Sequence, residues 1–431
     1  MALLTMQTAT HRSPVVTPSP AATRRYRQVR AATEALCKPL ATDDYSLQSM
    51  PDASPAKWHL AHTSWFFEEF VLQPFAPGYR VFNAAFRYLF NSYYEAVGPR
   101  LARAERGMLS RPTIEEVWRY REHVDDEMTA LLESGAVPQD ALRVITLGLH
   151  HEQQHQELLL TDIKHLFSRN PLLPAYAVAD DRTQHTAPAL SFHEIRGGLV
   201  DIGHSGSGFC FDNELPRHRV HVEPFLLANR AVTNGEWLEF VRDGGYERPE
   251  LWLAEGWDHV QREGWRAPLY WLDSLETEFT LCGEEPIDLH APVCHVSFYE
   301  ADAFARWAGA RLPTEFEWET AASEPSLRGH FAEDGYWHPR AVREPSQAAT
   351  SLIQMFGDVW EWTRSAYAPY PRYQPLPGAL GEYNGKFMVS QLVLRGGSCA
   401  TPRDHIRASY RNFFYPHARW QFSGVRLAKD A

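Results

Sequence analysis

The stretch HHEQQHQE at residues 150–157 combines a metal-binding pattern with a helical one and decides how this chain folds. It lies within residues 138–167, where apolar residues recur at i, i+3, i+4 and i+7, the spacing of one helix face. Residues four apart share a face, so His151 and His155 can bind one metal ion while Glu152 points elsewhere. The stretch therefore predicts two imidazole ligands on one long helix.

A third ligand is expected from the earlier segment WHLAHTSWFFEE at residues 58–69, which places His59 and His62 on another predicted helix. Histidines at such spacing also arise as solvated or capping residues, but two histidine-rich helical segments favour a metal site. Neutral imidazoles suit zinc, copper, iron and nickel, so the ligands do not identify the metal. Three protein ligands leave coordination positions open for a substrate and oxygen.

The same stretch satisfies the HExxH motif of zinc peptidases, in which the glutamate is the general base. In the metzincin class a third histidine follows six residues after the second, but Thr161 stands at that position here. His165 lies too far along the helix. The spacing therefore disfavours a peptidase.

The pattern along the whole chain predicts an α+β protein of two domains. The four predicted regions are a disordered tail at 1–25, a helical domain at 26–170, a linker at 171–190 and a loop-rich α+β domain at 191–431. The tail is rich in Thr, Ser, Pro and Ala and lacks the apolar core of a secretory signal. The second domain mixes short β-like runs at 199–202, 219–223 and 391–395 with helical pieces at 234–242 and 299–308.

Bulk properties restrict the class of function. A formal net charge of −12 argues against nucleic-acid binding, which needs a basic face to neutralise phosphates. No apolar run reaches the roughly 20 residues of a membrane span, so we expect a cytoplasmic protein without membrane contact. The five cysteines are scattered and form no CxxC pair, which indicates neither a disulfide framework nor a structural zinc site. Small-molecule chemistry remains, with no indication of oligomeric state.

These features resemble one known family, the sulfoxide synthases of ergothioneine biosynthesis, over nearly the whole chain. The family fuses a DinB-like four-helix bundle to a loop-rich domain like formylglycine-generating enzyme, which has a C-type-lectin-like fold. The segments that carry the resemblance are 58–69, 90–98, 106–112 and 151–157 in the first domain, and 311–319, 357–362, 394–398 and 423–426 in the second.

The resemblance implies a non-haem Fe(II) site in which His62, rather than His59, joins His151 and His155. Its implied reaction uses O2 to couple a cysteinyl thiol to C2 of the imidazole of hercynine (Nα-trimethylhistidine), giving a sulfoxide. The thiol substrate is cysteine or γ-glutamylcysteine, with cysteine slightly favoured. A soft thiolate can bind iron directly, which places sulfur beside the other reactants.

The resemblance also assigns substrate contacts. Gln154 matches a residue that contacts the hercynine ring, and Arg103 and Arg106 match a pair that binds the carboxylates of the thiol substrate. Residues Asn412, Phe413 and Phe414 lie where the family binds the betaine of hercynine and the amino group of the thiol. One branch of the family has Asn-Trp-Asp there, so this chain lacks the carboxylate that would bind the amino group in that branch. The arginines could instead be solvated, and Phe414 could belong to a buried aromatic cluster.

A tyrosine hydroxyl is expected to supply a proton in the oxygen reaction and to prevent simple thiol dioxygenation. Tyr93 and Tyr94 are the candidates, with Tyr383 in reserve, although adjacent tyrosines often serve only in packing. The copper chemistry of formylglycine-generating enzymes is not expected, since Cys399 has no partner cysteine downstream. A thiol transferase that needs no O2 and a non-catalytic binding module remain the alternatives.

Overall fold

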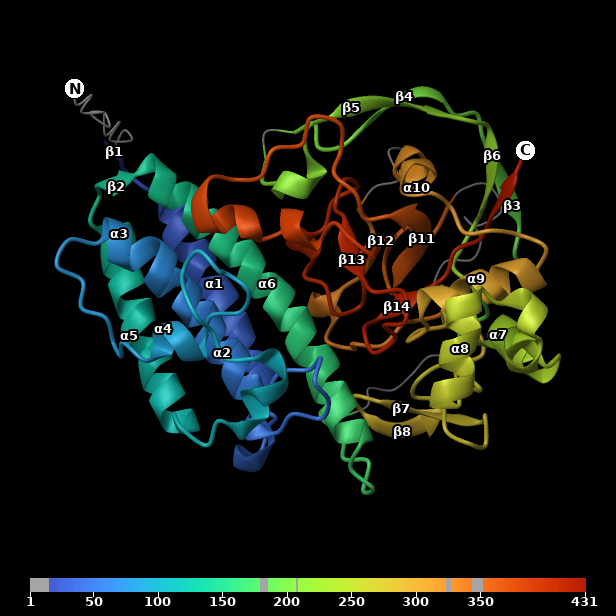
Figure 1. Cartoon of the computed structure of the whole chain (residues 1–431), viewed down its shortest axis with the longest axis horizontal. Coiled ribbons are helices and arrows are strands. Elements are labelled where there is room, and N and C mark those ends of the chain that lie inside the picture. The colour runs from blue at the N-terminus through green and yellow to red at the C-terminus, as the bar shows by residue number, and fades with distance from the viewer. Residues whose placement is uncertain (1–14, 179–184, 207, 323–326, 343–351) are drawn as a thin grey trace, which may run out of the picture.

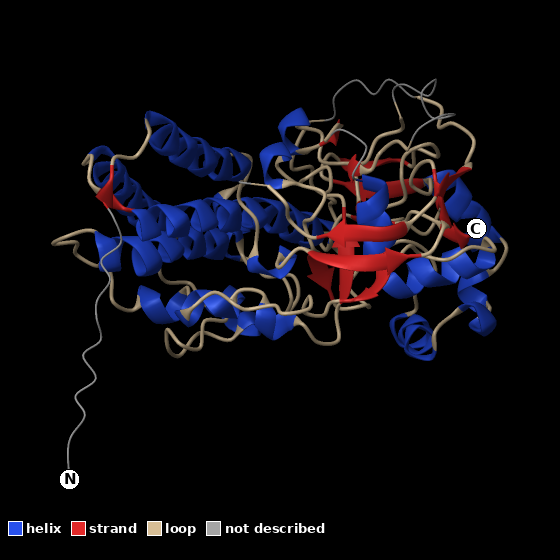
Figure 2. Cartoon of the chain, turned by 90° about the horizontal axis from the view of Figure 1, so that it is seen from above, coloured by secondary structure: helices blue, strands red, loops and turns tan. Residues whose placement is uncertain are grey.

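The computed structural model describes residues 15–178, 185–206, 208–322, 327–342 and 352–431. Figure 1 shows a helical part and a mixed part with strands, and Figure 2 shows that the two lie beside each other along the long axis. The predicted α+β class with an N-terminal helical bundle is therefore confirmed.

Long helices form the N-terminal bundle, and all but the start of the first lie within the region that the sequence predicts to be helical. They are α1 (Pro20–Cys37), α2 (Ala56–Phe67), α5 (Ile114–Glu133) and α6 (Gln139–Ser168). A π-helical turn, Glu68–Leu72, extends α2 into the short helix α3 (Gln73–Phe75), and α4 (Phe86–Leu89) follows. Strand β1 (Val15–Val16) pairs antiparallel with β2 (Val137–Pro138) beside the start of α6.

Local sequence explains where these helices begin. Thr113 and Glu116 form a capping box at the start of α5, in which each side chain accepts a hydrogen bond from the backbone N–H of the other. Helix α6 starts directly after Pro138, a residue that cannot donate a backbone hydrogen bond within a helix.

The predicted tail is too long. Helix α1 begins at Pro20, because proline suits the first helical turn and because Tyr26 and Val29 bury their side chains in the bundle. Residues 1–14 of the predicted tail lie outside the described residues, as do residues 179–184 of the predicted linker. The described part of that linker has no helix or strand, but its Tyr176 is bonded to both domains, through its hydroxyl to Leu36 O and its amide to Leu281 O.

The second domain is built from small sheets joined by long loops. Its central sheet has the order β13–β12–β11–β14, and another has the order β15–β6–β3. Hairpins β4–β5 and β7–β8 and the parallel pair β9–β10 complete the strands. The strands are β3 (Phe192–Ile195), β4 (Gly198–Ile202), β5 (His218–Val222), β6 (Phe225–Ala228), β7 (Thr277–Thr280), β8 (Gly283–Pro286), β9 (Gly329–His330), β10 (Phe356–Gly357), β11 (Trp360–Ala366), β12 (Leu392–Arg395), β13 (Asn412–Phe414), β14 (Ser423–Gly424) and β15 (Ala428–Asp430).

In the described part of this domain, the sheets are accompanied by the helices α7 (Asn234–Arg242), α8 (Ala254–Glu263), α9 (Phe298–Trp307) and α10 (Glu315–Ala322). Trp360 and Trp362 are buried in the core, as expected for residues of the fold rather than of the chemistry. Gly396 and Gly397 have φ values of +100° and +81°, which only glycine adopts without strain.

Helix α6 joins the two domains. Figure 1 shows it between the other bundle helices and the strands of the second domain. Glu157 of α6 accepts hydrogen bonds from Trp360 Nε1 (2.8 Å), Ser398 Oγ (2.5 Å) and Thr401 Oγ1 (2.7 Å). Further along α6, Lys164 Nζ lies 2.8 Å from His295 Nε2. Helix α6 is therefore part of the bundle and is also bonded along its length to the second domain.

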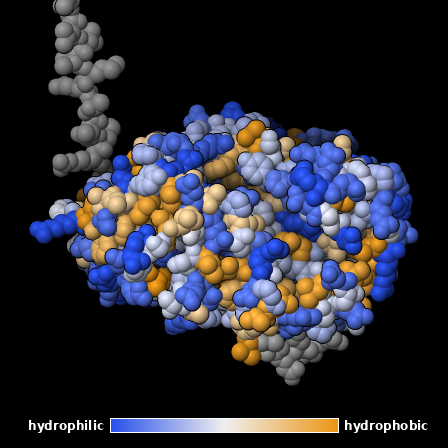
Figure 3. Space-filling view, turned by 60° about the horizontal axis from the view of Figure 1, so that its bottom comes forward, coloured by the Kyte–Doolittle hydropathy of each residue, from blue (hydrophilic) through white to orange (hydrophobic). Residues whose placement is uncertain are grey.

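The surface is mixed in character. Figure 3 shows hydrophobic side chains interspersed among hydrophilic ones on one face. Among the described helices, none combines the length and apolar character needed to cross a membrane.

A buried ion network holds the second domain together and yields a prediction. Glu315 bonds to Arg395 (2.9 Å) and to Arg411 (2.8 and 2.9 Å). Burial alone would raise the pKa of Glu315, but Arg411 and Arg395 bring it below its usual value. We expect Glu315→Gln to lower the free energy of unfolding at pH 7 by about 3–5 kcal/mol, since the buried Arg411 loses its carboxylate partner and Arg395 keeps only Glu319.

The pH dependence of this loss has a defined sign. A carboxyl group with a depressed folded-state pKa contributes its stability above the unfolded pKa and loses it as the pH falls through the folded pKa. The difference between parent and variant should therefore persist from neutral pH down to about pH 4 and shrink below it. Denaturant titrations across this range measure it, with the exposed Glu250→Gln as a control of little effect. A constant difference down to the lowest pH would contradict this account of Glu315.

Candidate metal centre

Three histidines from two helices meet inside the bundle. His62 lies on α2, and His151 and His155 lie one turn apart on α6, with one ring nitrogen from each within 4.8 Å of the others. His62 Nε2 and His151 Nε2 are 3.2 Å apart. Their side chains are buried, with 0%, 2% and 9% of the surface exposed, respectively. The predicted ligand set is thus brought together in space.

The donor set fits a metal ion. Imidazole nitrogens bind divalent metals at about 2.0–2.1 Å, so three nitrogens at these separations can share one ion. Burial is the main cause that lowers the pKa of His151 to about 3 and those of His62 and His155 well below the usual value. The rings therefore stay neutral and keep the lone pairs that metal binding requires.

Hydrogen bonds behind the rings fix two of them. His62 Nδ1 donates to the carbonyl of Phe90 at 2.6 Å, and the ring stacks between Trp58 and Trp65 at centroid distances of 4.5 and 5.4 Å. His155 Nδ1 lies 2.9 Å from His59 Nδ1. His59, the alternative third ligand, therefore lies behind His155 and is not in the metal-binding group.

The third predicted ligand, His151, is held in a different way from His62 and His155. His151 Nδ1 is buried without a hydrogen-bond partner among the described residues. Its ring packs against Phe66 and Tyr383, at centroid distances of 4.7 and 5.7 Å. Packing, rather than hydrogen bonding, sets the direction of this imidazole.

Glu152 points away from the three histidines, as the helical spacing predicts. One carboxylate oxygen bonds to Arg121 Nη2 and Thr33 Oγ1, both at 2.7 Å, and the other to Arg30 Nη1 at 3.1 Å. Although burial opposes it, Arg30 and Arg121 lower the pKa of Glu152 to about 2. A carboxylate so bound cannot act as the general base of a zinc peptidase.

Tyr383 is the tyrosine beside the histidines. Its ring packs on His151, and its hydroxyl donates to Gln154 Oε1. Tyr93 packs on Tyr383 at 6.2 Å between ring centroids, and Tyr94 packs behind Tyr93 at 4.7 Å. Among the three candidate tyrosines, the geometry therefore favours Tyr383, whose ring contacts a predicted metal ligand. The sequence could not show this contact, because Tyr383 and His151 lie far apart in the chain.

Gln154 lies at the interface of the two domains, where its amide is held at both ends. Besides accepting from Tyr383, it donates through Nε2 to the hydroxyl of Tyr410 at 2.6 Å. That hydroxyl lies 3.0 Å from His405 Nε2. Tyr410 and His405 were absent from the sequence predictions, since no local spacing relates them to the histidine stretch.

The two arginines predicted to bind the thiol substrate, Arg103 and Arg106, differ in their exposure to solvent. Arg103 is exposed, whereas Arg106 is buried and stacks on Trp58, with its guanidinium carbon 3.3 Å from the ring centroid. Arg106 donates to Ser54 Oγ at 2.9 Å and Ser92 Oγ at 3.2 Å, and its Nε has no partner among the described residues. Burial and the nearby Arg103 lower the pKa of Arg106. Within the described part of the chain this guanidinium forms no ion pair, and the nearby charge of Asp162 only partly offsets the lowering of its pKa.

Strand β13 places its residues on opposite faces. Phe413 stacks on Tyr367 at 4.1 Å and lies 5.9 Å from Phe387, which in turn contacts Tyr93. Phe414 contacts Trp420 on the other face, as the alternation of a strand requires. Asn412 Oδ1 accepts a bond from the Phe413 amide. Phe413, but not Phe414, connects with the tyrosines at the interface.

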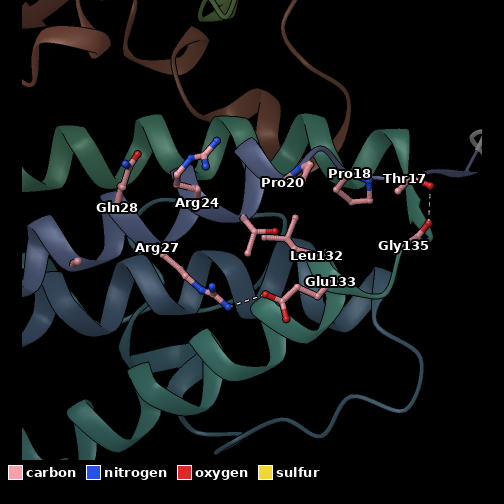
Figure 4. A pocket seen from close by; sticks show the side chains of 11 residues that line it. Thr17, Pro18, Pro20, Arg24, Arg27, Gln28, Leu132, Glu133 and Gly135 are labelled. Atoms are coloured by element: carbon pink, nitrogen blue, oxygen red, sulfur yellow. Dashed lines mark hydrogen bonds and ion pairs between the residues drawn. The ribbon is translucent and has the colours of Figure 1, made fainter.

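A separate pocket of about 710 Å³ lies between α1 and the end of α5 (Figure 4). The Arg27–Glu133 ion pair at 2.8 Å and Leu132 form part of its wall. None of the three histidines lines it, so this pocket is not part of the metal centre.

Comparisons with known proteins agree with the two-domain architecture. Residues 25–159 match the DinB superfamily, and residues 176–431 match the sulfatase-modifying factor enzyme 1-like domain. The chain is 33% identical to a hercynine oxygenase of Mycobacterium tuberculosis, over 90% of this chain and 94% of that protein. It is 36% identical to a hercynine oxygenase of Mycolicibacterium smegmatis, over 66% of this chain and 71% of that protein. A formylglycine-generating enzyme of Streptomyces coelicolor is 29% identical over 60% of this chain and 96% of its own length.

The close approach of α2 and α6 gives a prediction at Gly148. A Cβ atom there would lie 2.7 Å from Phe67 and 2.8 Å from Phe66, both buried rings of α2. Glycine to alanine in a helix normally adds up to about 1 kcal/mol of stability. Here we expect Gly148→Ala to cost about 1–3 kcal/mol through overpacking and to weaken metal binding, because α2 moves away from His151.

Thermal unfolding and a Co(II) titration measure both effects. The exposed Thr146→Ala on the same helix is the control and should change neither strongly. A Gly148→Ala protein more stable than the parent would show that the helices are not in tight contact.

Proposed function

Because this chain belongs to the hercynine oxygenase family, it is an oxygenase of ergothioneine biosynthesis, and we propose that it is an Fe(II)-dependent sulfoxide synthase. It would join the sulfur of a cysteinyl thiol to C2 of the hercynine imidazole, with O2 as co-substrate. The observation that carries this proposal is the group of three neutral, buried imidazoles beside Tyr383 and Gln154 at the domain interface.

The ligand set supports iron without being unique to it. His62, His151 and His155 would hold Fe(II), and three protein ligands leave positions for other groups. Bound there, Fe(II) would supply redox chemistry with O2 and a position for the soft thiolate sulfur. The protein's own part is to bring the two organic substrates together and to exclude water from them.

Arg106 is the proposed partner of the thiol substrate's carboxylate. It is a buried cation without a counter-ion in the described part of the chain, and one ring, Trp58, separates it from His62. A substrate carboxylate there would neutralise the guanidinium and place the thiol near the histidines. Arg103 begins the same short helix, Arg103–Met108, at the surface and would assist at the entrance. One buried cation suits cysteine, with its single carboxylate, better than γ-glutamylcysteine.

Gln154 and Phe413 are the proposed contacts of hercynine. The Gln154 amide offers both a donor and an acceptor to an imidazole ring, and its orientation is fixed by Tyr383 and Tyr410. Phe413 belongs to an aromatic group with Tyr367 and Phe387, whose ring faces attract a quaternary ammonium. Asn412 is linked to this group only through the hydrogen bond that its Oδ1 accepts from the Phe413 amide, and Phe414 faces away from the group.

Tyr383 is the proposed proton donor. Its hydroxyl is ordered by Gln154, and burial raises its pKa, so it remains protonated and able to donate. Tyr93 would support it from behind, and Tyr94 would support Tyr93. In this arrangement the predicted pair acts through packing rather than by donating the proton.

Metal loading followed by oxygen uptake tests the proposal. The purified protein, loaded with Fe(II), is given hercynine with cysteine or γ-glutamylcysteine, and products are identified by mass spectrometry. We expect O2 consumption and a carbon–sulfur product, both lost in His62→Ala and His155→Ala. Turnover without O2 would favour a thiol transferase instead, and no consumption or product with either thiol would reject the proposal.

A product-ratio experiment tests the role of Tyr383. We expect Tyr383→Phe to reduce sulfoxide formation by about 100-fold or more, the usual range for loss of a general acid, while thiol oxidation to the sulfinic acid continues. Tyr94→Phe is the matched control and should keep the parent's product ratio. If Tyr94→Phe changes the ratio and Tyr383→Phe does not, the proton donor is in the predicted pair.

A further inference from the structure

Behind one of the three histidines lies a buried row of polar groups that the proposed reaction does not use. Asp162 Oδ2 is 3.0 Å from His59 Nε2, and His59 Nδ1 is 2.9 Å from His155 Nδ1. All three side chains are buried. His59 lies one turn before His62 on α2, and Asp162 lies two turns after His155 on α6, so both helices contribute.

The arrangement assigns the protons. Asp162 Oδ2 also accepts a hydrogen bond from the Ser54 amide at 2.8 Å, so this carboxylate oxygen acts as an acceptor. Neutral His59 then donates to it through Nε2 and keeps a lone pair on Nδ1. His155 must then donate through Nδ1, which leaves its Nε2 lone pair free.

We propose that Asp162 and His59 are positioning residues, which hold His155 in the tautomer that directs the Nε2 lone pair toward the metal. The inference rests on the metal site of the proposed function but not on its substrates or oxygen chemistry. Partners of this kind orient ligand imidazoles and raise their basicity, and their loss costs about 10- to 100-fold in metal affinity. Here the carboxylate acts through an intervening imidazole.

The same row reaches the proposed carboxylate site. Ser54 gives its backbone N–H to Asp162 and accepts at its hydroxyl from Arg106 Nη1. The two bonds use different atoms of Ser54, so a substitution can separate them. Ser54→Ala removes the bond from Arg106 and keeps the bond to Asp162, which makes it a matched control for metal binding.

Co(II) titration without substrates tests the inference, since its ligand-field spectrum reports the ligand set. The informative variants are His59→Phe, which removes the acceptor, and His59→Asn, whose Oδ1 stands near the position of Nδ1 and still accepts from His155. Asp162→Asn removes the charge at nearly constant size. We expect Co(II) affinity to fall about 10- to 100-fold in His59→Phe and Asp162→Asn. His59→Asn and Ser54→Ala should bind within a few-fold of the parent.

Thermal unfolding of the metal-free proteins separates positioning from a general loss of structure. His165→Phe is a further control, because His165 lies on α6 but bonds to Ser49 instead of a ligand. Equal Co(II) affinity and spectra in the parent, His59→Phe and Asp162→Asn would overturn the inference. So would equal losses in His59→Asn and His59→Phe. If the affinities shift as expected but no sulfoxide forms, the proposed function fails and this inference stands.

Discussion

The buried ion pairs of Glu152 with Arg30 and Arg121 fix the rotation of α6, and the rest of the site depends on that rotation. Each residue of a helix is turned by about 100° from the last, so adjacent side chains point in different directions. With Glu152 held toward α1 and α5, His151 and His155 face α2, where His62 meets them. Gln154 and Glu157 then face the second domain. A rotation of α6 would separate Glu152 from both arginines and leave its charge buried and unpaired, so this rotation is strongly opposed.

The second domain completes a site that the bundle alone leaves open. Glu157 receives three hydrogen bonds from it, which fix the two domains against each other. The interface then presents Tyr383 to His151 and Tyr410 to Gln154. Metal ligands and the buried arginine therefore come from one domain, and the tyrosine and aromatic surfaces come from the other. This division suits a reaction between two substrates, because each domain can contribute side chains that bind one of them.

The sequence alone predicted a helical first domain and the long helix that carries His151 and His155, because apolar spacing is a local signal. It could not rank Tyr93, Tyr94 and Tyr383, since the contact between Tyr383 and His151 joins residues far apart in the chain. His59 was named as a candidate ligand but not as a partner of His155, and helical spacing could have suggested Asp162, which shares a face with His155. The opposite orientation of Phe413 and Phe414 also follows from the sequence, but only after residues 412–414 are known to form the strand β13. The start of α1 was missed because its first turn, residues 20–23, has the same Pro, Ala and Thr composition as the residues that precede it.

The central claim is that the three-histidine site uses O2 to form a sulfoxide between a thiol and hercynine. The most direct measurement is the isotopic composition of the product made by the Fe(II)-loaded protein under heavy-isotope-labelled dioxygen. The account predicts that the sulfoxide oxygen carries the label and that His151→Ala forms no such product. An unlabelled sulfoxide, or the same product formed without O2, would contradict it.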